Sequence, residues 1–260
     1  MQFGKIAIIG AGNTAYTLCK VLKSKEIEPF CVLVRNPEKA EKVRADLDVE
    51  VVFSYEKVLE SDLAIIAVND DAISEVAAHL IDYKGLVVHT SGTKSSEVLN
   101  RIERYGVFYL PYTMSKERNI SFDDVPLLIY ANSPEDMIRL NGFAEQLSSK
   151  VQYCDDEQRK TIHLAAVYVS NFTNVMLGIG DKLLKENGLS LDLMRPLVME
   201  MMKKSFEISP EKALTGPARR GDIQTILDHE EMLVNSPKEL EIYKVLTNYI
   251  LEKYQKNEKL

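Results

Sequence analysis

The stretch Lys5-Ile6-Ala7-Ile8-Ile9-Gly10-Ala11-Gly12-Asn13-Thr14-Ala15 decides the expected fold, because a strand-length apolar run meets a glycine-rich turn that opens a helical pattern. In such a turn Gly10 makes the tight bend, Gly12 lets a phosphate approach the backbone, and Ala15 lets the helix pack closely on the strand. The helix N-terminus then offers free N–H groups and a partial positive charge. The alternative is a tight turn with a purely structural role. Because the stretch follows the first strand and opens a helix, it predicts instead a dinucleotide site formed by Gly10, Ala11, Gly12, Asn13, Thr14 and Ala15.

Outward from this turn, short apolar runs alternate with amphipathic segments as far as about Lys150. The apolar runs predict strands at 5–9, 29–34, 50–53, 63–68, 86–89, 107–109 and 127–130. The segments between them predict helices at 14–24, 37–46, 55–61, 73–81, 95–105 and 134–147. Continuous Val/Ile/Leu strands joined by crossover helices are typical of a doubly wound parallel sheet that is buried on both faces.

After about Lys150 the apolar residues recur at helical spacing. It predicts helices at 156–187, 191–208, 222–233 and 237–254, with Asn187-Gly188 as a left-handed stop and Ser236-Pro237 as a helix start. The sequence therefore predicts an α/β fold of two domains. Residues 1–153 form a doubly wound parallel Rossmann sheet, and residues 154–260 form an all-helical domain.

The end of the second predicted strand bears on the choice of cofactor. An NAD site places Asp or Glu there for the ribose 2′-hydroxyl, whereas this chain reads Val34-Arg35-Asn36-Pro37. Arg35 can pair with a 2′-phosphate, and Asn36 can add an amide donor, so the sequence favours NADP(H). The alternative is a surface arginine after a strand. Later strand ends predict further cofactor contacts at Val68, Asn69 and Ser91, with helix capping by Asp70 or Asp71 as the competing interpretation.

Composition limits the classes of partner. The chain has 260 residues and a formal net charge of -7, with no basic face for nucleic acid. The apolar stretches are strand-sized, short of the roughly 20 residues that cross a bilayer, so no membrane partner is expected. Cys19, Cys31 and Cys154 are odd in number and lack metal-ligand or disulfide spacing. Reduced thiols, no metal and a cytoplasmic location are the resulting expectations.

With these residues in view, the chain resembles a Rossmann-like family of NADP oxidoreductases that carry a helical C-terminal domain of undefined function. That family is distantly related to pyrroline-5-carboxylate reductase, ketopantoate reductase and the 6-phosphogluconate dehydrogenase superfamily. The most specific blocks are His163-Leu-Ala-Ala-Val-Tyr-Val-Ser-Asn171-Phe-Thr-Asn174 and Thr215-Gly-Pro-Ala-Arg-Arg-Gly-Asp222. The resemblance covers nearly the whole chain. It implies a substrate cleft between the domains and a homodimer formed through the helical halves.

The sequence departs from the wider superfamily on the long predicted helix. Its hydroxyacid dehydrogenases carry Lys one turn before Asn, but Val167 stands four residues before Asn171. His163, Ser170, Asn171 and Asn174 fall on one side of this helix if it is a regular α-helix. We expect His163 to donate a proton and Asn171 to orient the substrate, the alternative being a structural role for both. Expected substrate contacts are Ser91, Gly92, Asn174 and Arg220, while the loop ending in Asp222 is equally consistent with a helix cap.

The leading functional hypothesis is NADP(H)-dependent reduction of a small carbonyl or imine compound by hydride transfer. Because the lysine is missing, a second hypothesis remains open, namely a non-catalytic NADP-binding sensor or scaffold. The helical half also carries many apolar positions, which favour a two-fold dimer. These positions are Met176, Leu177, Leu197, Val198, Met201 and Met202.

Overall fold

The first strand, β1 (Ile6–Ile9), lies inside a sheet, and all of its residues are buried. This computed structural model describes residues 3–254 of the chain. Within them the sheet has eight strands in the order β3-β2-β1-β4-β5-β6-β7-β8. The other strands are β2 (Cys31–Leu33), β3 (Val51–Val52), β4 (Leu63–Ile66), β5 (Leu86–His89), β6 (Tyr105–Tyr109), β7 (Leu127–Ala131) and β8 (Val151–Tyr153).

The chain reverses the direction of strand addition at β1, which pairs with β2 on one side and β4 on the other. In open α/β sheets such a switch point forms a crevice at the carboxyl ends of the strands. Strands β1 to β6 are mutually parallel, as predicted, but β7 runs antiparallel to β6. No crossover helix joins these two strands among the described residues, so the chain returns in the opposite direction.

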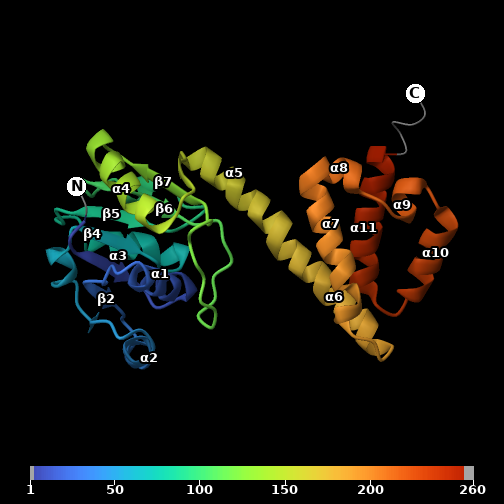
Figure 1. The fold of residues 1–260 in the computed structure, drawn as a ribbon, viewed down its shortest axis with the longest axis horizontal. Helices are drawn as coiled ribbons and strands as arrows, with labels where there is room; N and C mark the ends of the chain where they lie inside the picture. The colour runs from blue at the N-terminus through green and yellow to red at the C-terminus, as the bar shows by residue number, and fades with distance from the viewer. Residues whose placement is uncertain (1–2, 255–260) are drawn as a thin grey trace. The chain divides into compact units, whose positions relative to one another are not determined.

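Helices cover both faces of the sheet (Figure 1). On one face lie α1 (Asn13–Ser24), α2 (Pro37–Leu47) and α4 (Pro134–Leu147), which share a buried cluster with Ile6 and Ile8. On the other lie α3 (Ile73–Ala78) and two short 3-10 turns, which share a buried cluster with Ala7 and Ile9. Alternate residues of β1 thus serve opposite cores, which explains the unbroken apolar run.

Two predicted helices are shorter than expected. The segments predicted at 55–61 and 95–105 contain only 3-10 turns at Val58–Glu60 and Ser96–Leu99. Tyr105 begins β6 instead, because it pairs with Val87 in the sheet. A further 3-10 turn at Asp70–Ala72 precedes α3. Tertiary pairing here overrides the local helical pattern.

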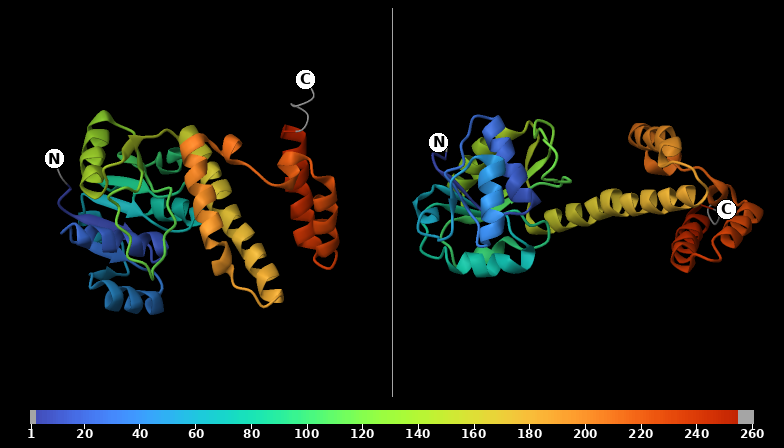
Figure 2. Two further views of the ribbon diagram at one scale, coloured as in Figure 1. Left: turned by 45° about the vertical axis from the view of Figure 1, so that its right-hand side comes forward. Right: turned by 90° about the horizontal axis from the view of Figure 1, so that it is seen from below.

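A long helix begins after the sheet (Figure 2). It consists of α5 (Asp156–Ala166), a π-helical segment (Val167–Phe172) and α6 (Thr173–Glu186). Asp155 and Gln158 form a capping box at its start, and Gly188, with a φ of 70°, follows its end. Within the 31-residue span Asp156–Glu186 an 18-residue window has a mean hydropathy of 1.3, so by length and composition alone this helix could cross a membrane. The core helix of a soluble protein passes the same test.

The remaining elements are helical, as predicted. They are a 3-10 turn (Leu191–Met194), α7 (Arg195–Ile208), α8 (Pro210–Ala213), α9 (Pro217–Arg220), α10 (Ile223–Met232) and α11 (Pro237–Tyr254). The chain forms two compact units, residues 1–170 and 171–260, which we call unit 1 and unit 2. The predicted division at 153/154 coincides with the end of β8, whereas these units divide within the long helix.

Candidate functional site

The turn between β1 and α1 fits the role that its sequence indicates. Gly10 has a φ of +135°, and a Cβ there would lie 2.3 Å from the carbonyl oxygen of Ala67, so only glycine is accommodated. Gly12 is different, because a Cβ there would meet no atom within 4 Å. Gly12 is also the N-cap of α1, and no side chain caps that turn. The first N–H groups of α1 therefore remain available for an anion.

A cavity of about 540 Å³ opens beside this turn, at the carboxyl ends of β1, β2 and β4. Eight predicted cofactor residues line it: Gly10, Ala11, Gly12, Asn13, Arg35, Asn36, Val68 and Asn69. Thr14, Ala15 and Ser91 are not among its lining residues. Ala15 is buried at the start of α1, which is consistent with close helix–strand packing. The position and residue types fit a dinucleotide in the crevice of the switch point.

Two of the predicted cofactor residues, Arg35 and Asn36, follow the end of β2. Arg35 lines the cavity and forms an ion pair with Glu75 of α3, in which one guanidinium nitrogen donates to the carboxylate. The other N–H groups of the guanidinium stay available to a phosphate. Asn36 caps α2, because its Oδ1 accepts from the N–H of Lys39 at 3.0 Å. These groups fit a 2′-phosphate and provide no strand-end carboxylate for a 2′-hydroxyl.

Three polar side chains of the cavity were not predicted from the sequence: those of Lys39, Tyr55 and Lys116. Lys39 could have been found, since it lies three residues after Asn36 in the first turn of a helix. Lys116 gave no local signal, because it belongs to the loop between β6 and β7. Its Nζ lies 4.4 Å from the ring centroid of Tyr16, and its carbonyl accepts from Lys20 at 2.7 Å. Folding alone brings this cation to the cavity.

The loop after β5 is held by hydrogen bonds of its own. The hydroxyl of Ser91 accepts from the N–H groups of Thr93 at 3.1 Å and Lys94 at 3.0 Å. Thr93 in turn donates to Asp70 at 2.5 Å. Ser91 therefore stabilises the turn, and it is not among the residues that line the cavity.

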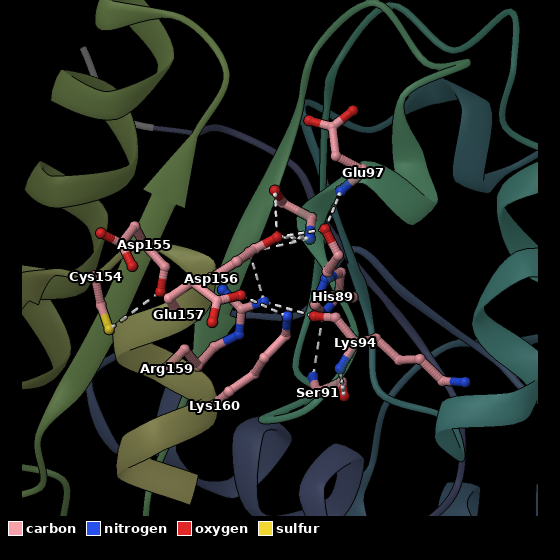
Figure 3. Close-up of polar contacts among 12 residues, drawn as sticks. His89, Ser91, Lys94, Glu97, Cys154, Asp155, Asp156, Glu157, Arg159 and Lys160 are labelled. Atoms are coloured by element: carbon pink, nitrogen blue, oxygen red, sulfur yellow. Dashed lines mark hydrogen bonds and ion pairs between the residues drawn. The ribbon is translucent and has the colours of Figure 1, made fainter.

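A buried polar cluster supports this loop (Figure 3). Arg159 has no exposed surface, pairs with Asp156 at 2.7 Å and donates to the carbonyl of Lys94 at 2.5 Å. His89 is also fully buried, and its Nδ1 accepts from the N–H of Ser91 at 3.2 Å. Burial, followed by the charge of Arg159, lowers the pKa of His89 to about 4. His89 is therefore neutral near pH 7 and belongs to the packing of the loop.

His163 lies at the same edge of the sheet as the cavity. Its Nδ1 is 3.0 Å from the hydroxyl of Tyr109, at the carboxyl end of β6. A Cβ on Gly92, which follows β5, would lie 2.5 Å from the same nitrogen, so the imidazole packs directly on this glycine. Neighbouring strands are about 4.8 Å apart, and β5 is the second strand from β1. His163 thus stands roughly 10 Å or more along the edge from the glycine turn, on the side of β4.

The described contacts join none of the other predicted residues of the helical part to His163. Asn171 and Asn174 are exposed, and no described contact joins either to His163. Ser170 contacts Thr113, with 3.3 Å between the hydroxyl oxygens. Arg220 is exposed at the end of α9. Asp222 caps α10 by accepting from the N–H of Thr225 at 3.2 Å, which is the capping alternative that the sequence left open.

The switch-point crevice, the uncapped helix and the cations after β2 define the class of Rossmann proteins that bind a dinucleotide. Residues 5–91 match the family model described as NADP oxidoreductase, coenzyme F420-dependent. Residues 125–250 match the domain of unknown function DUF2520. None of the curated proteins is significantly similar in sequence.

Solved structures extend this comparison over the whole chain. A proposed NADP oxidoreductase from Bacteroides fragilis is 36% identical, with a TM-score of 0.88, and the match covers 95% of this chain and 98% of that one. The chain belongs to this family of NADP oxidoreductases, and its cofactor is NADP(H).

More distant structures share the fold. A 1-pyrroline-5-carboxylate reductase from Streptococcus pyogenes is 14% identical, with a TM-score of 0.65 and coverage of 96% and 99% of the two chains. An imine reductase from Myxococcus stipitatus, solved with NADP+, is 13% identical, with a TM-score of 0.65 and coverage of 98% and 94%.

Proposed function

We propose that this protein reduces a small carbonyl or imine compound at the expense of NADPH, with His163 as the proton donor. The observation that carries the proposal is the placement of His163 against Gly92 and Tyr109, at the carboxyl ends of β5 and β6. The dinucleotide cavity occupies the same edge at β2, β1 and β4. Catalytic groups of doubly wound sheets meet their ligands at this edge.

Reduction of a C=O or C=N bond requires transfer of a hydride and a proton to the substrate. NADPH supplies the hydride when bound, and a protein group or water must supply the proton. Within unit 1, His163 is a half-buried titratable side chain at this edge, whereas His89 is fully buried and its pKa is depressed. An imidazole titrates near neutrality, which suits a general acid. The reductases of pyrroline-5-carboxylate and of imines that share this fold favour a C=N or C=O substrate.

The test is oxidation of NADPH in the presence of 2-oxo acids, aldehydes and cyclic imines, followed by the loss of absorbance of the reduced cofactor. We expect turnover with at least one class and a fall in kcat by about 10²–10⁴ in His163→Gln. His229→Gln is the matched control, since His229 also contacts a tyrosine hydroxyl at 3.0 Å but lies in unit 2. Its kcat should equal that of the unmodified protein.

Two results would contradict this proposal in different ways. Full activity in His163→Gln would remove His163 from the chemistry while leaving the reductase activity in place. Tight binding of NADPH with no oxidation across all three substrate classes would favour the non-catalytic sensor or scaffold instead.

A further inference from the structure

Tyr109 and His163 form a pair whose geometry follows from a hydrogen bond, the contact of the two rings and the close approach of Gly92. The Oη of Tyr109 lies 3.0 Å from Nδ1 of His163, and the two ring centroids are 6.0 Å apart at an interplanar angle of 62°. A Cβ on Gly92 would lie 2.5 Å from Nδ1 and 2.9 Å from Cε2 of Tyr109. Gly92 therefore packs against both rings. The Nδ1 side of the imidazole is covered, which leaves Nε2 as the nitrogen that a ligand can reach.

The direction of the hydrogen bond follows from the surroundings of the phenol. Tyr109 is only 7% exposed, and within residues 3–254 its hydroxyl has no hydrogen-bond partner other than His163. If Nδ1 carried the hydrogen, it would donate to Oη and leave the hydroxyl hydrogen buried without an acceptor. An unpaired buried donor is costly, and a neutral imidazole offers one acceptor nitrogen. The hydroxyl therefore donates to Nδ1.

The phenol can play this part at neutral pH because it keeps its proton. Burial raises the pKa of Tyr109 above its usual value, and the charge of Arg159 offsets that effect only in part. The Tyr109 hydroxyl is thus protonated, and able to donate, at neutral pH.

We propose that Tyr109 is a positioning residue that holds neutral His163 in the tautomer with its hydrogen on Nε2, directed to a substrate oxygen or nitrogen. The purpose of this arrangement rests on the proposed function, but the tautomer does not depend on it. A fixed tautomer matters because an imidazole with its hydrogen on Nδ1 would present an acceptor to the substrate, where reduction needs a donor. As the hydrogen on Nε2 passes to the substrate, Nδ1 takes the hydrogen of the Tyr109 hydroxyl, so the imidazole stays neutral and solvent then restores the proton of the phenol.

The experiment is a long-range ¹H–¹⁵N NMR spectrum of the full-length ¹⁵N-labelled protein at about pH 8.5, where histidine is neutral. The chain has four histidines, so His163→Gln assigns the signals of interest. We expect a pyridine-type Nδ1 and a pyrrole-type Nε2 in the unmodified protein. In Tyr109→Phe both nitrogens should move toward intermediate shifts, which report exchange between the two tautomers.

Tyr243→Phe is the matched control. Tyr243 lies 3.0 Å from Nδ1 of His229 in unit 2, so its loss should change the signals of His229 and leave those of His163 unchanged. Gly92→Ala is a second route, because the added methyl group must displace both rings. It should loosen the tautomer of His163 even if Tyr109→Phe does not fold.

The outcomes separate this inference from the proposed function. A hydrogen on Nδ1 in the unmodified protein, or a Tyr109→Phe spectrum identical to it at His163, would overturn the role of Tyr109. The expected spectra together with no reduction of any carbonyl or imine would overturn the proposed function and leave the tautomer assignment standing. Reduction of a carbonyl or imine by a protein with the hydrogen on Nδ1 of His163 would overturn the tautomer assignment and leave the reductase activity standing.

Discussion

At the scale of single residues, Arg35 and Lys39 follow β2 closely and both line the dinucleotide cavity. A 2′-phosphate beside them gains charge-assisted hydrogen bonds that a 2′-hydroxyl cannot make. We expect the protein to bind NADPH more tightly than NADH, and Arg35→Ala or Lys39→Ala to weaken NADPH binding by about 1–3 kcal/mol each. Binding titrations at fixed ionic strength measure this difference. Lys42→Ala, also on α2 but outside the cavity, is the control. Equal affinity of the unmodified protein for both cofactors would contradict the assignment.

His89 makes stability depend on pH. Its pKa is lowered to about 4 in the folded protein, against roughly 6.5 in an unfolded chain. The unfolded state therefore binds the proton first, and folding stability falls as the pH drops from above 6.5 toward 4. We expect a loss of about 2 kcal/mol between pH 8 and pH 5 from this group. Urea unfolding at both pH values measures it. His89→Gln should flatten the dependence, while His79→Gln, at an exposed position, should retain it.

Single residues also show which parts of the site could be predicted from the sequence and which could not. The glycine turn, Arg35 and Asn36 could be predicted as cavity residues because their positions are local, with a strand, a turn and a helix start in sequence order. Tyr109 was not found, since it lies 54 residues from His163 and reads only as part of an apolar strand. Glu75 and Lys116 were missed for the same reason. Contacts between distant segments become visible only when the sheet is assembled.

At the scale of elements, the two glycines of the turn between β1 and α1 have different roles: Gly10 is needed for stability and Gly12 for binding of NADPH. Gly10→Ala places a methyl group against the carbonyl of Ala67 at a φ of +135°, so we expect a loss of stability of about 1–3 kcal/mol or more. Gly12→Ala meets no protein atom within 4 Å, so it should fold normally and yet bind NADPH poorly, because the methyl group occupies the approach of the phosphates. Thermal unfolding and NADPH titration of both variants test this contrast. Equal stabilities, or normal binding by Gly12→Ala, would contradict it.

Elements were predicted well where the apolar pattern was long. All seven expected strands are present, because buried parallel strands are continuous Val/Ile/Leu runs. β8 was missed, since Val151–Tyr153 is short and largely exposed at the edge of the sheet. The antiparallel direction of β7 was missed, because direction depends on the connection between strands. A loop at 110–126 replaces the crossover helix that parallel pairing requires.

The π-helical segment Val167–Phe172 changes what the long helix presents. The predicted stripe of His163, Ser170, Asn171 and Asn174 assumed 3.6 residues per turn. A π segment adds residues to its turn and rotates everything after it relative to His163. The azimuths calculated for Asn171 and Asn174 at 3.6 residues per turn therefore do not apply to this helix.

At the scale of the whole molecule, the two units differ in how completely they bury their apolar residues. Unit 1 contains extensive clusters on both faces of the sheet. Within the described part of unit 2, only four residues are buried: Ala218, Ile226, Leu233 and Thr247. Large apolar side chains of the same unit are exposed, among them Leu197 at 65% and Phe206 at 90%. Exposure on this scale marks an interaction surface.

A second copy of the chain is the occupant that we propose for this surface. A two-fold axis places one apolar patch against itself, and an obligate interface buries more than about 2,000 Å². We expect light scattering to give twice the monomer mass of 29.5 kDa at micromolar concentration. Leu197→Glu should shift the protein to monomer, because a carboxylate buried without a partner opposes association. Ile138→Glu is the matched control, since Ile138 is equally exposed, at 72%, but lies on α4 of unit 1. A 29.5 kDa species from the unmodified protein would contradict the dimer, and dissociation by Ile138→Glu would place the interface on unit 1 instead.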